Sequence, residues 1–489
     1  MVGLDVQSAE RFREALTQAG YNETEIPKLV GSQTDLTWTA PHPYLLLRRI
    51  TGQGVLQDLI RLYLCGARLT REGAAAALGE FSLEQAVQAG FLALDGDRVR
   101  SPLRIVPWDG LLFAFDGDRR GADVVTGVNP AAKRLACLTV RPKGDFALDL
   151  GTGCGIQALL AARHSRRVVG VDINPRALWF SDLNARLNGV VNFDIRNGSW
   201  FEPVPETDFD LIVANPPFVV SPDSEFLFRD SGLPGDSVCR DVIGRIPGHL
   251  AEGGYACVLC SWVQAEEKDW WSRPAAWAQE LGCDVLIIRY VTEPVLDYAV
   301  MWNQELHAGD PGAYQAVIDR WLAYYHSAQI EAISTGVVVL RRRSTPPGNW
   351  VLGLDGVTVA TGPSGDHLLR LFAAQDYLRS LPGEAAVLEE VLTLAEGHVL
   401  DQRLTFRDGG YVVQPSRMRM PQGIGLEGQV EPNLVQVLLQ CDGQRRLGEL
   451  VGEAAATLGT NEAELRISCL RTFRQLIELG FVVPSGRIS

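Results

Sequence analysis

The sequence lacks any apolar run of the roughly 18–20 residues that a membrane-spanning helix requires. Its first twenty residues contain an early acid, Asp5, and no apolar core, which distinguishes them from a signal peptide. Glycine (49 residues) and proline (26 residues) are near average usage, which excludes a collagen-like or low-complexity chain. The 489 residues, 46% of them hydrophobic, therefore indicate a cytoplasmic globular protein with roughly three domains and no membrane partner.

Lysine is scarce, and acids outnumber bases along the whole chain. The only lysines are Lys28, Lys133, Lys143 and Lys268. The 45 basic residues are mostly arginine, and 59 acids give a net charge of −14. General binding of nucleic acid through its phosphates is therefore not expected. A nucleic-acid target would need a local basic patch, for which Arg163, Arg166 and Arg167 are candidates, and a protein target stays open.

The nine cysteines are an odd number and lie in apolar surroundings, which is typical of reduced, buried thiols in a cytosolic protein. Cys257 and Cys260 form one CxxC pattern. A structural zinc site needs four ligands, and neither a second pair nor a nearby histidine accompanies these two. Residues three apart on a strand also point to opposite faces. We therefore expect no metal site.

The two ends of the chain show similar helical patterns, each followed by a short hairpin. At the start, the predicted helices span residues 8–19, 55–63, 70–78 and 82–89, and a turn at 95–96 follows. At the end, they span 435–439, 447–458 and 462–479. The two patterns end in segments of similar sequence, AGFLALDGDRV and LGFVVPSGRI. Short helices followed by a hairpin indicate a winged-helix-like module at each end.

Between these ends, β-rich runs alternate with helical segments. The runs are residues 146–150, 167–173, 209–214, 255–260, 283–290 and 336–343. Such alternation predicts an α/β fold, a doubly wound and mostly parallel sheet with helices on both faces. We expect three domains: a helical one over 1–110, the α/β one over 111–345, and an α+β one over 346–489 that ends in the module at about 431–489. Within the last, residues 364–397 look helical, and turns at 355–356 and 409–410 separate predicted strands.

A glycine-rich turn follows the first predicted strand of the α/β region. It reads Asp-Leu-Gly-Thr-Gly-Cys-Gly over residues 149–155 and leads into a helix. Its glycines allow a tight turn and the close approach of a ligand to the backbone. The turn matches neither the phosphate-binding pattern, which needs a following Gly-Lys-Ser/Thr, nor the dinucleotide spacing. Asp149 also suits a ligand with an ammonium group better than a pyrophosphate.

Two further polar positions follow strands of the same predicted sheet. Asp172 ends the second strand, where an acid is placed to bind two ribose hydroxyls. Asn215, Pro216, Pro217 and Phe218 follow the strand 209–214. The prolines cannot continue a strand ladder, so the chain leaves the sheet there. Asn215 is then held at the carboxyl end of a strand, where open α/β sheets bind ligands, although such Pro-containing stretches are also often plain turns.

The motifs DLGTGCG, VDINP and NPPF, in this order, resemble class I S-adenosylmethionine-dependent methyltransferases of the NPP(F/Y) branch, in a multidomain bacterial form. That branch methylates exocyclic amines of nucleic-acid bases or the glutamine amide of release factors. The resemblance covers about 123–342 and implies a seven-stranded Rossmann-like core that binds S-adenosylmethionine.

The resemblance also implies roles for individual residues. Asp149, Gly151 and Gly153 would line the methionine part of the cofactor, and Asp172 would hold its ribose. The expected cofactor contacts in full are Asp149, Gly151, Thr152, Gly153, Gly155, Asp172, Ile173, Asn197, Ser199, Trp200 and Asn215. Relatives often have an aspartate near the adenine where this chain has Ser199, so Asn197, Ser199 or a backbone N–H would have to replace that contact.

The expected chemistry concerns a nitrogen whose lone pair is delocalised. The side-chain oxygen of Asn215 and the carbonyl of Pro216 would accept its two hydrogens and turn the lone pair toward the methyl group. Phe218 would stack on the flat acceptor, and Pro217 would fix the turn. Possible substrate contacts are Arg229, Asp230 and Trp262. The alternative for Arg229 and Asp230 is that they form a local ion pair in a solvated loop.

The substrate itself stays open on sequence grounds. A nucleobase amine in RNA or DNA is favoured, with a protein glutamine amide close behind, and the flanking domains would recognise this macromolecule. The alternatives are a small-molecule or peptide methyltransferase and a catalytically silent scaffold with binding modules. The aromatic residues between the last two predicted strands, including Trp302, Trp321 and Tyr325, indicate either core packing or base stacking.

Overall fold

The computed structural model describes residues 5–31, 43–117, 119, 121–142, 144–230, 232–264, 269–278, 281–307, 311–344, 348–355, 362–421 and 423–485. The chain forms two compact units. The first consists of Met1–Ala136 and Arg141–Asp355, and the second of Cys137–Val140 and Gly356–Ser489. Within the described residues, no helix is both long and apolar enough to cross a membrane.

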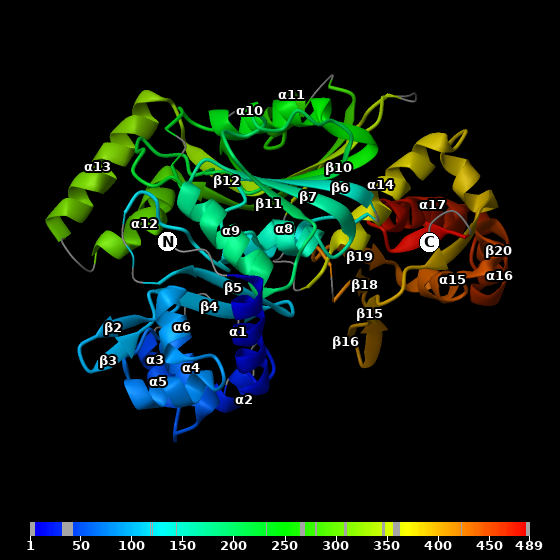
Figure 1. The fold of residues 1–489 in the computed structure, drawn as a ribbon. Helices are drawn as coiled ribbons and strands as arrows, with labels where there is room; N and C mark the ends of the chain where they lie inside the picture. Colours follow the sequence, from blue (N-terminus) through cyan, green and yellow to red (C-terminus); the bar gives the residue numbers. More distant parts are fainter. Residues whose placement is uncertain are drawn as a thin grey trace. The chain divides into compact units, whose positions relative to one another are not determined.

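An eight-stranded sheet forms the centre of the first unit (Figure 1). Its strands are β6 (Gly144–Leu150), β7 (Ser165–Asp172), β8 (Phe193–Asn197), β9 (Phe209–Ala214), β10 (Leu250–Gln264), β11 (Cys283–Pro294), β12 (Ala332–Arg342) and β13 (Val351–Leu354). They lie in the order β13-β11-β12-β10-β9-β6-β7-β8, and β12 alone runs antiparallel to its neighbours. The predicted α/β fold is confirmed.

The sheet has one strand more than the seven that the family resemblance implied. The eighth strand, β13, pairs in parallel with β11 at the edge of the sheet. The predicted strand in this region began near residue 353, and its continuation over 356–361 lies outside the described residues. The run 209–214 folds as predicted, as β9, because its almost continuous apolar sequence suits a strand that is covered on both faces.

Helices cover both faces of this sheet (Figure 1). One face carries α8 (Ile156–Ala161) and α9 (Pro175–Leu187), and the other carries α10 (Ser237–Arg245) and α11 (Ser272–Ala278). Helix α9 begins with Asn174, whose side chain accepts a hydrogen bond from the Arg176 N–H, and with a proline at the first helical position. The parallel strands therefore end at one edge, where the loops before these helices meet.

The segment between β11 and β12 is a helical hairpin, α12 (Val295–His307) and α13 (Pro311–Ser327). Trp321 and Tyr325 of α13 are fully buried, which favours the packing interpretation over base stacking. The hairpin also holds the chain that follows the NPPF motif. Tyr298 Oη accepts from the Val220 N–H at 3.2 Å, and Tyr325 Oη donates to the Val220 carbonyl at 2.7 Å.

The N-terminal part of the first unit is helical. It contains α1 (Val6–Gln18), α2 (Glu25–Val30), α3 (Pro43–Arg49), α4 (Val55–Tyr63), α5 (Arg71–Leu78) and α6 (Leu83–Gln88), with a small sheet of β1 (Leu69–Thr70), β3 (Arg98–Arg100) and β2 (Ala93–Asp95). The predicted helices are present, and α2 and α3 are additional. The winged-helix assignment of this part stays a prediction.

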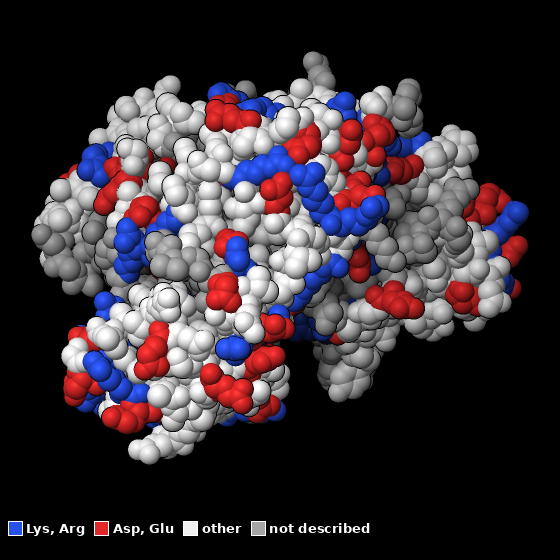
Figure 2. All heavy atoms as spheres, in the orientation of Figure 1, with Lys and Arg blue, Asp and Glu red and all other residues white. Residues whose placement is uncertain are grey.

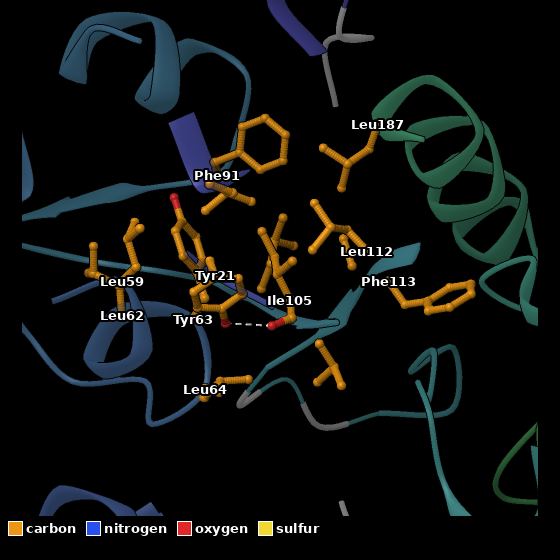
Figure 3. Close-up of a cluster of buried hydrophobic side chains, with 14 of the residues drawn as sticks. Tyr21, Leu59, Leu62, Tyr63, Leu64, Phe91, Ile105, Leu112, Phe113 and Leu187 are labelled. Atoms are coloured by element: carbon orange, nitrogen blue, oxygen red, sulfur yellow. Dashed lines mark hydrogen bonds between the residues drawn. The ribbon is translucent and has the colours of Figure 1, made fainter. Parts of the chain in front are cut away.

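A hairpin that the sequence analysis did not identify follows, with strands β4 (Leu103–Trp108) and β5 (Leu111–Asp116). The predicted boundary between residues 110 and 111 lies in the turn of this hairpin. One continuous apolar core runs from Ala9 in α1 to Leu187 in α9, and Figure 3 shows part of it around Tyr21, Ile105 and Leu187. The N-terminal part is thus packed firmly onto the sheet domain.

Tyr21 provides a test of this packing. Its side chain is buried, and its hydroxyl donates to the Ile105 carbonyl at 2.7 Å (Figure 3). Tyr21→Phe leaves the buried carbonyl without this donor, which costs about 1–3 kcal/mol. We expect a lower midpoint of thermal unfolding, measured by calorimetry. An unchanged midpoint would show that water replaces the hydroxyl.

The second unit combines helices with three small sheets. Its helices are α14 (Gly365–Ser380), α15 (Val435–Leu439), α16 (Leu447–Leu458) and α17 (Glu462–Glu478), with 3-10 turns at Glu384–Glu389 and Pro432–Leu434. The sheets are β20-β14-β21, β15-β18-β19 and β16-β17. Their strands are β14 (Val391–Leu394), β15 (Val399–Asp401), β16 (Leu404–Arg407), β17 (Gly410–Val413), β18 (Ser416–Arg419), β19 (Glu427–Val430), β20 (Asp442–Arg446) and β21 (Val482–Pro484).

Two predictions for the second unit need correction. The helix expected over 364–397 ends at Ser380, because Pro382 and Gly383 follow, and residues 391–394 form β14 instead. The turn expected at 409–410 lies at Asp408 and Gly409, which both have positive φ (52° and 82°), as two-residue hairpin turns require. The predicted last strand near 487–488 lies outside the described residues.

Candidate functional site

A cavity of about 330 Å³ lies in the first unit at the carboxyl ends of β6, β7 and β9. The described residues that line it come from five segments. They are 124–132, the glycine-rich turn with the start of α8, the residues after β7 and β8, the NPPF motif, and the loop that follows this motif. This is the position at which open α/β sheets bind their ligands.

The glycine-rich turn forms the floor of this cavity. Gly151, Gly153 and Gly155 all have positive φ (69°, 57° and 86°), which other residues adopt only with strain. A Cβ at Gly155 would also lie 2.9 Å from the Leu159 side chain. Gly151, Thr152 and Gly153 line the cavity, whereas Gly155 supports the turn from behind. The backbone conformation therefore favours glycine at all three positions, and lack of space adds to this at Gly155.

Asp149 lies at the end of β6 and is buried beneath this turn. Its Oδ2 accepts from the Thr152 hydroxyl at 2.7 Å and from the Ala158 N–H at 3.0 Å. Burial raises the pKa of Asp149 to about 7, although both hydrogen bonds oppose this shift. The carboxylate thus lines the cavity and also ties the turn to α8.

Asp172 lies at the end of β7 and faces the same cavity. Its Oδ2 accepts from the Gly153 N–H at 2.8 Å, and its Oδ1 accepts from the Asn174 N–H at 2.9 Å. Burial raises its pKa from the ordinary value, against the effect of these backbone donors. Each carboxylate oxygen has a second lone pair that remains available to a ligand.

The residues after β7 and β8 form one side of the cavity. Ile173, which is 61% exposed, lines it together with Ser199 and Trp200. Asn197, another expected cofactor contact, does not line it. Its side-chain amide lies 3.3 Å from the Asp172 carbonyl and 3.4 Å from the Ile173 carbonyl, so it supports the end of β7.

Asn215 and Pro217 line the cavity directly after β9. Within the described part of the chain, the side chain of Asn215 forms no hydrogen bond, so its oxygen and amide are open to a ligand. Pro216 is buried next to it and does not line the cavity. Phe218 is only 9% exposed and packs edge-on against Trp302, with ring centroids 6.3 Å apart. The expected stacking of Phe218 on an acceptor is therefore not apparent in this structure.

The loop after the NPPF motif contributes more than the sequence analysis expected. Leu227 and Phe228 line the cavity and are 47% and 43% exposed. Asp230 also lines it, and its carboxylate accepts from Ser221 Oγ at 2.9 Å, the Phe226 N–H at 3.2 Å and Arg229 Nε at 2.9 Å. Asp230 thus fixes the loop, and Arg229 serves as its ion-pair partner.

Trp262 is placed differently from its predicted role in substrate contact. It is fully buried in β10, and its indole N–H donates to the Trp270 carbonyl at 2.8 Å. It does not line the cavity, so here it has a packing role. Residues 124–127 do line the cavity and were missed. The only nearby signal in the sequence was Asn129-Pro130, which begins helix α7 (Pro130–Leu138).

The cavity is acidic. None of its described lining residues is lysine or arginine, and three are carboxylates, Asp149, Asp172 and Asp230. The candidate phosphate patch is also neutralised. Arg163 pairs with Asp109, Arg166 with Asp145, and Arg167 with Asp194 and Glu206. Figure 2 shows basic and acidic side chains interspersed over one face of the molecule. The site suits a cationic or neutral ligand.

Three family models match the chain. Residues 128–229 match the Methyltransferase small domain, which contains the glycine-rich turn, Asp172 and Asn215. Residues 18–102 match a Domain of unknown function (DUF7059), and residues 369–484 match another (DUF7782).

Curated relatives match part of the chain. A release factor glutamine methyltransferase of Aliivibrio fischeri is 43% identical over 81 residues, 16% of this chain and 28% of the relative. A putative protein N5-glutamine methyltransferase of Methanocaldococcus jannaschii is 32% identical over 26% of this chain and 66% of the relative. A release factor glutamine methyltransferase of Xylella fastidiosa is 32% identical over 29% and 55%. The chain thus spans between about a quarter and two thirds of the length of these relatives.

Proposed function

We propose that this chain, which carries a class I S-adenosylmethionine-dependent methyltransferase domain of the NPP(F/Y) branch, methylates an amide nitrogen. The amide would belong to a protein side chain. The observation that carries the proposal is the position of Asn215. Its unengaged amide faces the cavity that the glycine-rich turn and Asp172 also line. The flanking parts of the chain would select the protein that is modified.

The residues present fit the cofactor. The turn is a cradle that side chains on its glycines would strain, and none of the described residues that line the cavity is a base that would repel a sulfonium or an ammonium group. Asp149, Gly151 and Gly153 would hold the methionine part, Asp172 the ribose, and Ile173, Ser199 and Trp200 the adenine. When bound, S-adenosylmethionine supplies a methyl group on a positively charged sulfur.

Asn215 would act on the acceptor. An amide nitrogen is a poor nucleophile because its lone pair is delocalised into the carbonyl group. The side-chain oxygen of Asn215, which lines the cavity, would accept one of the two N–H hydrogens and so hold the nitrogen in one orientation. This contribution is one of positioning and electrostatics, and it requires no strong base before transfer.

The acidic lining supports a protein amide over a nucleobase amine, which reverses the order that the sequence favoured. A nucleotide brings phosphates, and the described residues that line the cavity offer them no cation, while the Asp172 carboxylate would repel them. A side-chain amide is neutral, and the exposed apolar side chains of Leu227 and Phe228 suit its aliphatic stem. The names of the relatives point to the same acceptor class.

Asp149 predicts how cofactor affinity depends on pH. Its pKa is raised to about 7, so the empty folded protein keeps a proton there that the unfolded chain releases at much lower pH. A cationic ligand favours the ionised form. We therefore expect S-adenosylmethionine affinity to rise from pH 6 to pH 8, by up to about tenfold per pH unit below 7. Titration calorimetry should show this rise in the wild type, and Asp149→Asn should flatten it. An equal slope in both proteins would contradict the assignment.

The acceptor class can be tested with labelled cofactor. The full chain is incubated with S-adenosylmethionine labelled on its methyl group and with a cell extract separated into protein, RNA, DNA and small molecules. We expect label in the protein fraction, removed by protease and resistant to nuclease. Label confined to RNA or DNA would support the nucleobase alternative and overturn the protein assignment. The absence of transfer and of cofactor binding would support a scaffold.

A further inference from the structure

Helix α9 lies between the glycine-rich turn and strand β5 of the N-terminal hairpin, and Asn184 joins the two. Its side chain is fully buried. The Asn184 oxygen accepts from the Ala114 N–H at 2.7 Å, and its amide donates to the Ala114 carbonyl at 2.9 Å. The same amide donates to the Cys154 carbonyl, inside the turn, at 2.8 Å. One side chain therefore links β5 to the cofactor turn directly.

These three bonds use the hydrogen-bonding capacity of an asparagine amide almost fully, because it has two N–H donors and one carbonyl oxygen. Loss of the side chain would leave the Cys154 and Ala114 groups unpaired in a buried environment, which is costly. One turn earlier on α9, Ser181 Oγ donates to the Gly153 carbonyl at 2.9 Å, so α9 fixes the turn at two adjacent carbonyls.

Asn188, one turn later, provides a natural comparison. Its oxygen accepts from the Leu112 N–H at 2.9 Å, and its amide donates to the Leu112 carbonyl at 2.8 Å. This repeats the contact of Asn184 with β5. The remaining donation of Asn188 is to the Asn184 carbonyl within α9, and it does not reach the glycine-rich turn. The two asparagines thus share the strand contact and differ in the contact with the cofactor site.

Strand β5 also shapes the opposite wall of the cavity. Asp116, its last residue, accepts from the Val125 N–H at 2.9 Å and donates its own N–H to the Val125 carbonyl at 3.2 Å. Val125 and Gly127 line the cavity. A Cβ at Gly127 would lie 2.0 Å from the Phe115 ring, so this wall packs tightly against β5. Both walls therefore depend on the placement of β5.

We propose that Asn184 is a positioning residue through which β5, and with it the N-terminal part, holds the glycine-rich turn in its cofactor-binding shape. Asn184 touches no reacting atom and acts through Cys154. The inference rests on the cofactor site of the proposed function. Because coupling between two sites is reciprocal, cofactor binding should in turn stabilise β5 on α9.

The test compares Asn184→Ala with Asn188→Ala in the full chain. Calorimetric titration with S-adenosylhomocysteine measures affinity, and thermal unfolding measures stability. We expect both variants to unfold at lower temperature, since each loses the bonds to β5. Asn184→Ala should weaken S-adenosylhomocysteine binding by at least about tenfold. Asn188→Ala should stay within about twofold of the wild type. Equal losses of affinity in the two variants would overturn the inference.

A measurement on the wild type and a second variant cover the case in which Asn184→Ala does not fold. Saturating S-adenosylhomocysteine should slow amide hydrogen exchange at residues 112–116 in the wild type. It should do so less in Ser181→Ala, which loses one tether of the turn and keeps the contact with β5. Unchanged exchange at 112–116 on binding would overturn the coupling. If the wild type binds no S-adenosylhomocysteine at millimolar concentration, the cofactor assignment fails, and the inference fails with it.

Discussion

Asn215→Ala is expected to lower kcat for methyl transfer by at least about 100-fold while S-adenosylhomocysteine affinity stays within about threefold of the wild type. The side chain of Asn215 lines the cavity and has no partner within the described part of the chain. Its removal therefore breaks no internal contact there. The acceptor nitrogen, however, loses the oxygen that would orient it. The loss should appear in turnover rather than in cofactor binding.

The readout for this variant is transfer of labelled methyl groups to the protein fraction, with calorimetric titration of S-adenosylhomocysteine as the internal control. The two measurements separate orientation of the acceptor from damage to the site. A variant that binds normally and transfers at the wild-type rate would contradict the role of Asn215. A variant that loses binding and transfer together would assign Asn215 to the cofactor instead.

Asp172→Asn is expected to weaken S-adenosylhomocysteine binding by roughly 10- to 100-fold. The substitution keeps the size of the side chain and removes its charge. A carboxylate accepts from the Gly153 and Asn174 N–H groups and still has lone pairs for two ribose hydroxyls. An amide replaces one of these acceptor oxygens with a donor, so one backbone N–H and the hydroxyls compete for a single oxygen.

Asp182→Asn is the matched control for this variant. Asp182 lies in α9, the helix that follows Asp172 in the chain. It pairs with Arg186 of the same helix and is partly exposed. Exposed pairs of this kind contribute little to stability. Calorimetric titration should therefore give wild-type affinity for Asp182→Asn. If Asp172→Asn also binds like the wild type, the ribose contact assigned to Asp172 is wrong.

The glycine-rich turn, the central strand and the NPPF turn could be predicted from the sequence because each depends on a few neighbouring residues. The turn at 149–155 needs glycines with positive φ, the run 209–214 is apolar enough for a central strand, and two prolines end that strand next to Asn215. Each signal lies within a few neighbouring residues. Asp149, Asp172 and Asn215 were therefore predicted to meet at one edge of the sheet, and they line one cavity.

The remaining features depend on contacts between segments that are distant in sequence. Phe218 packs against Trp302 because α12 lies beside it, and no local pattern announces that neighbour. Trp262 is buried in β10, where it pairs with Ser334 of β12, 72 residues later. The role of Asn184 requires β5, 70 residues earlier, to lie against α9. Sequence patterns predict strands and turns, whereas these partners follow only from the assembled fold.

The N-terminal part therefore contacts the cofactor site in two ways. Its apolar core continues into α9, and its strand β5 reaches both walls of the cavity. A protein that binds to this part would act close to the cofactor turn. If the flanking parts select the target, as we propose, this arrangement would link target binding to the shape of the cofactor turn.

The measurement that tests the central claim most directly is identification of the methylated atom. Protein labelled by the full chain is digested, and the modified peptide is sequenced by mass spectrometry. Acid hydrolysis then tests whether labelled methylamine is released, as an N-methylated side-chain amide requires. We predict one methyl group on a glutamine side-chain amide and its absence with Asn215→Ala. A methyl group on lysine, arginine or a nucleobase would contradict the account.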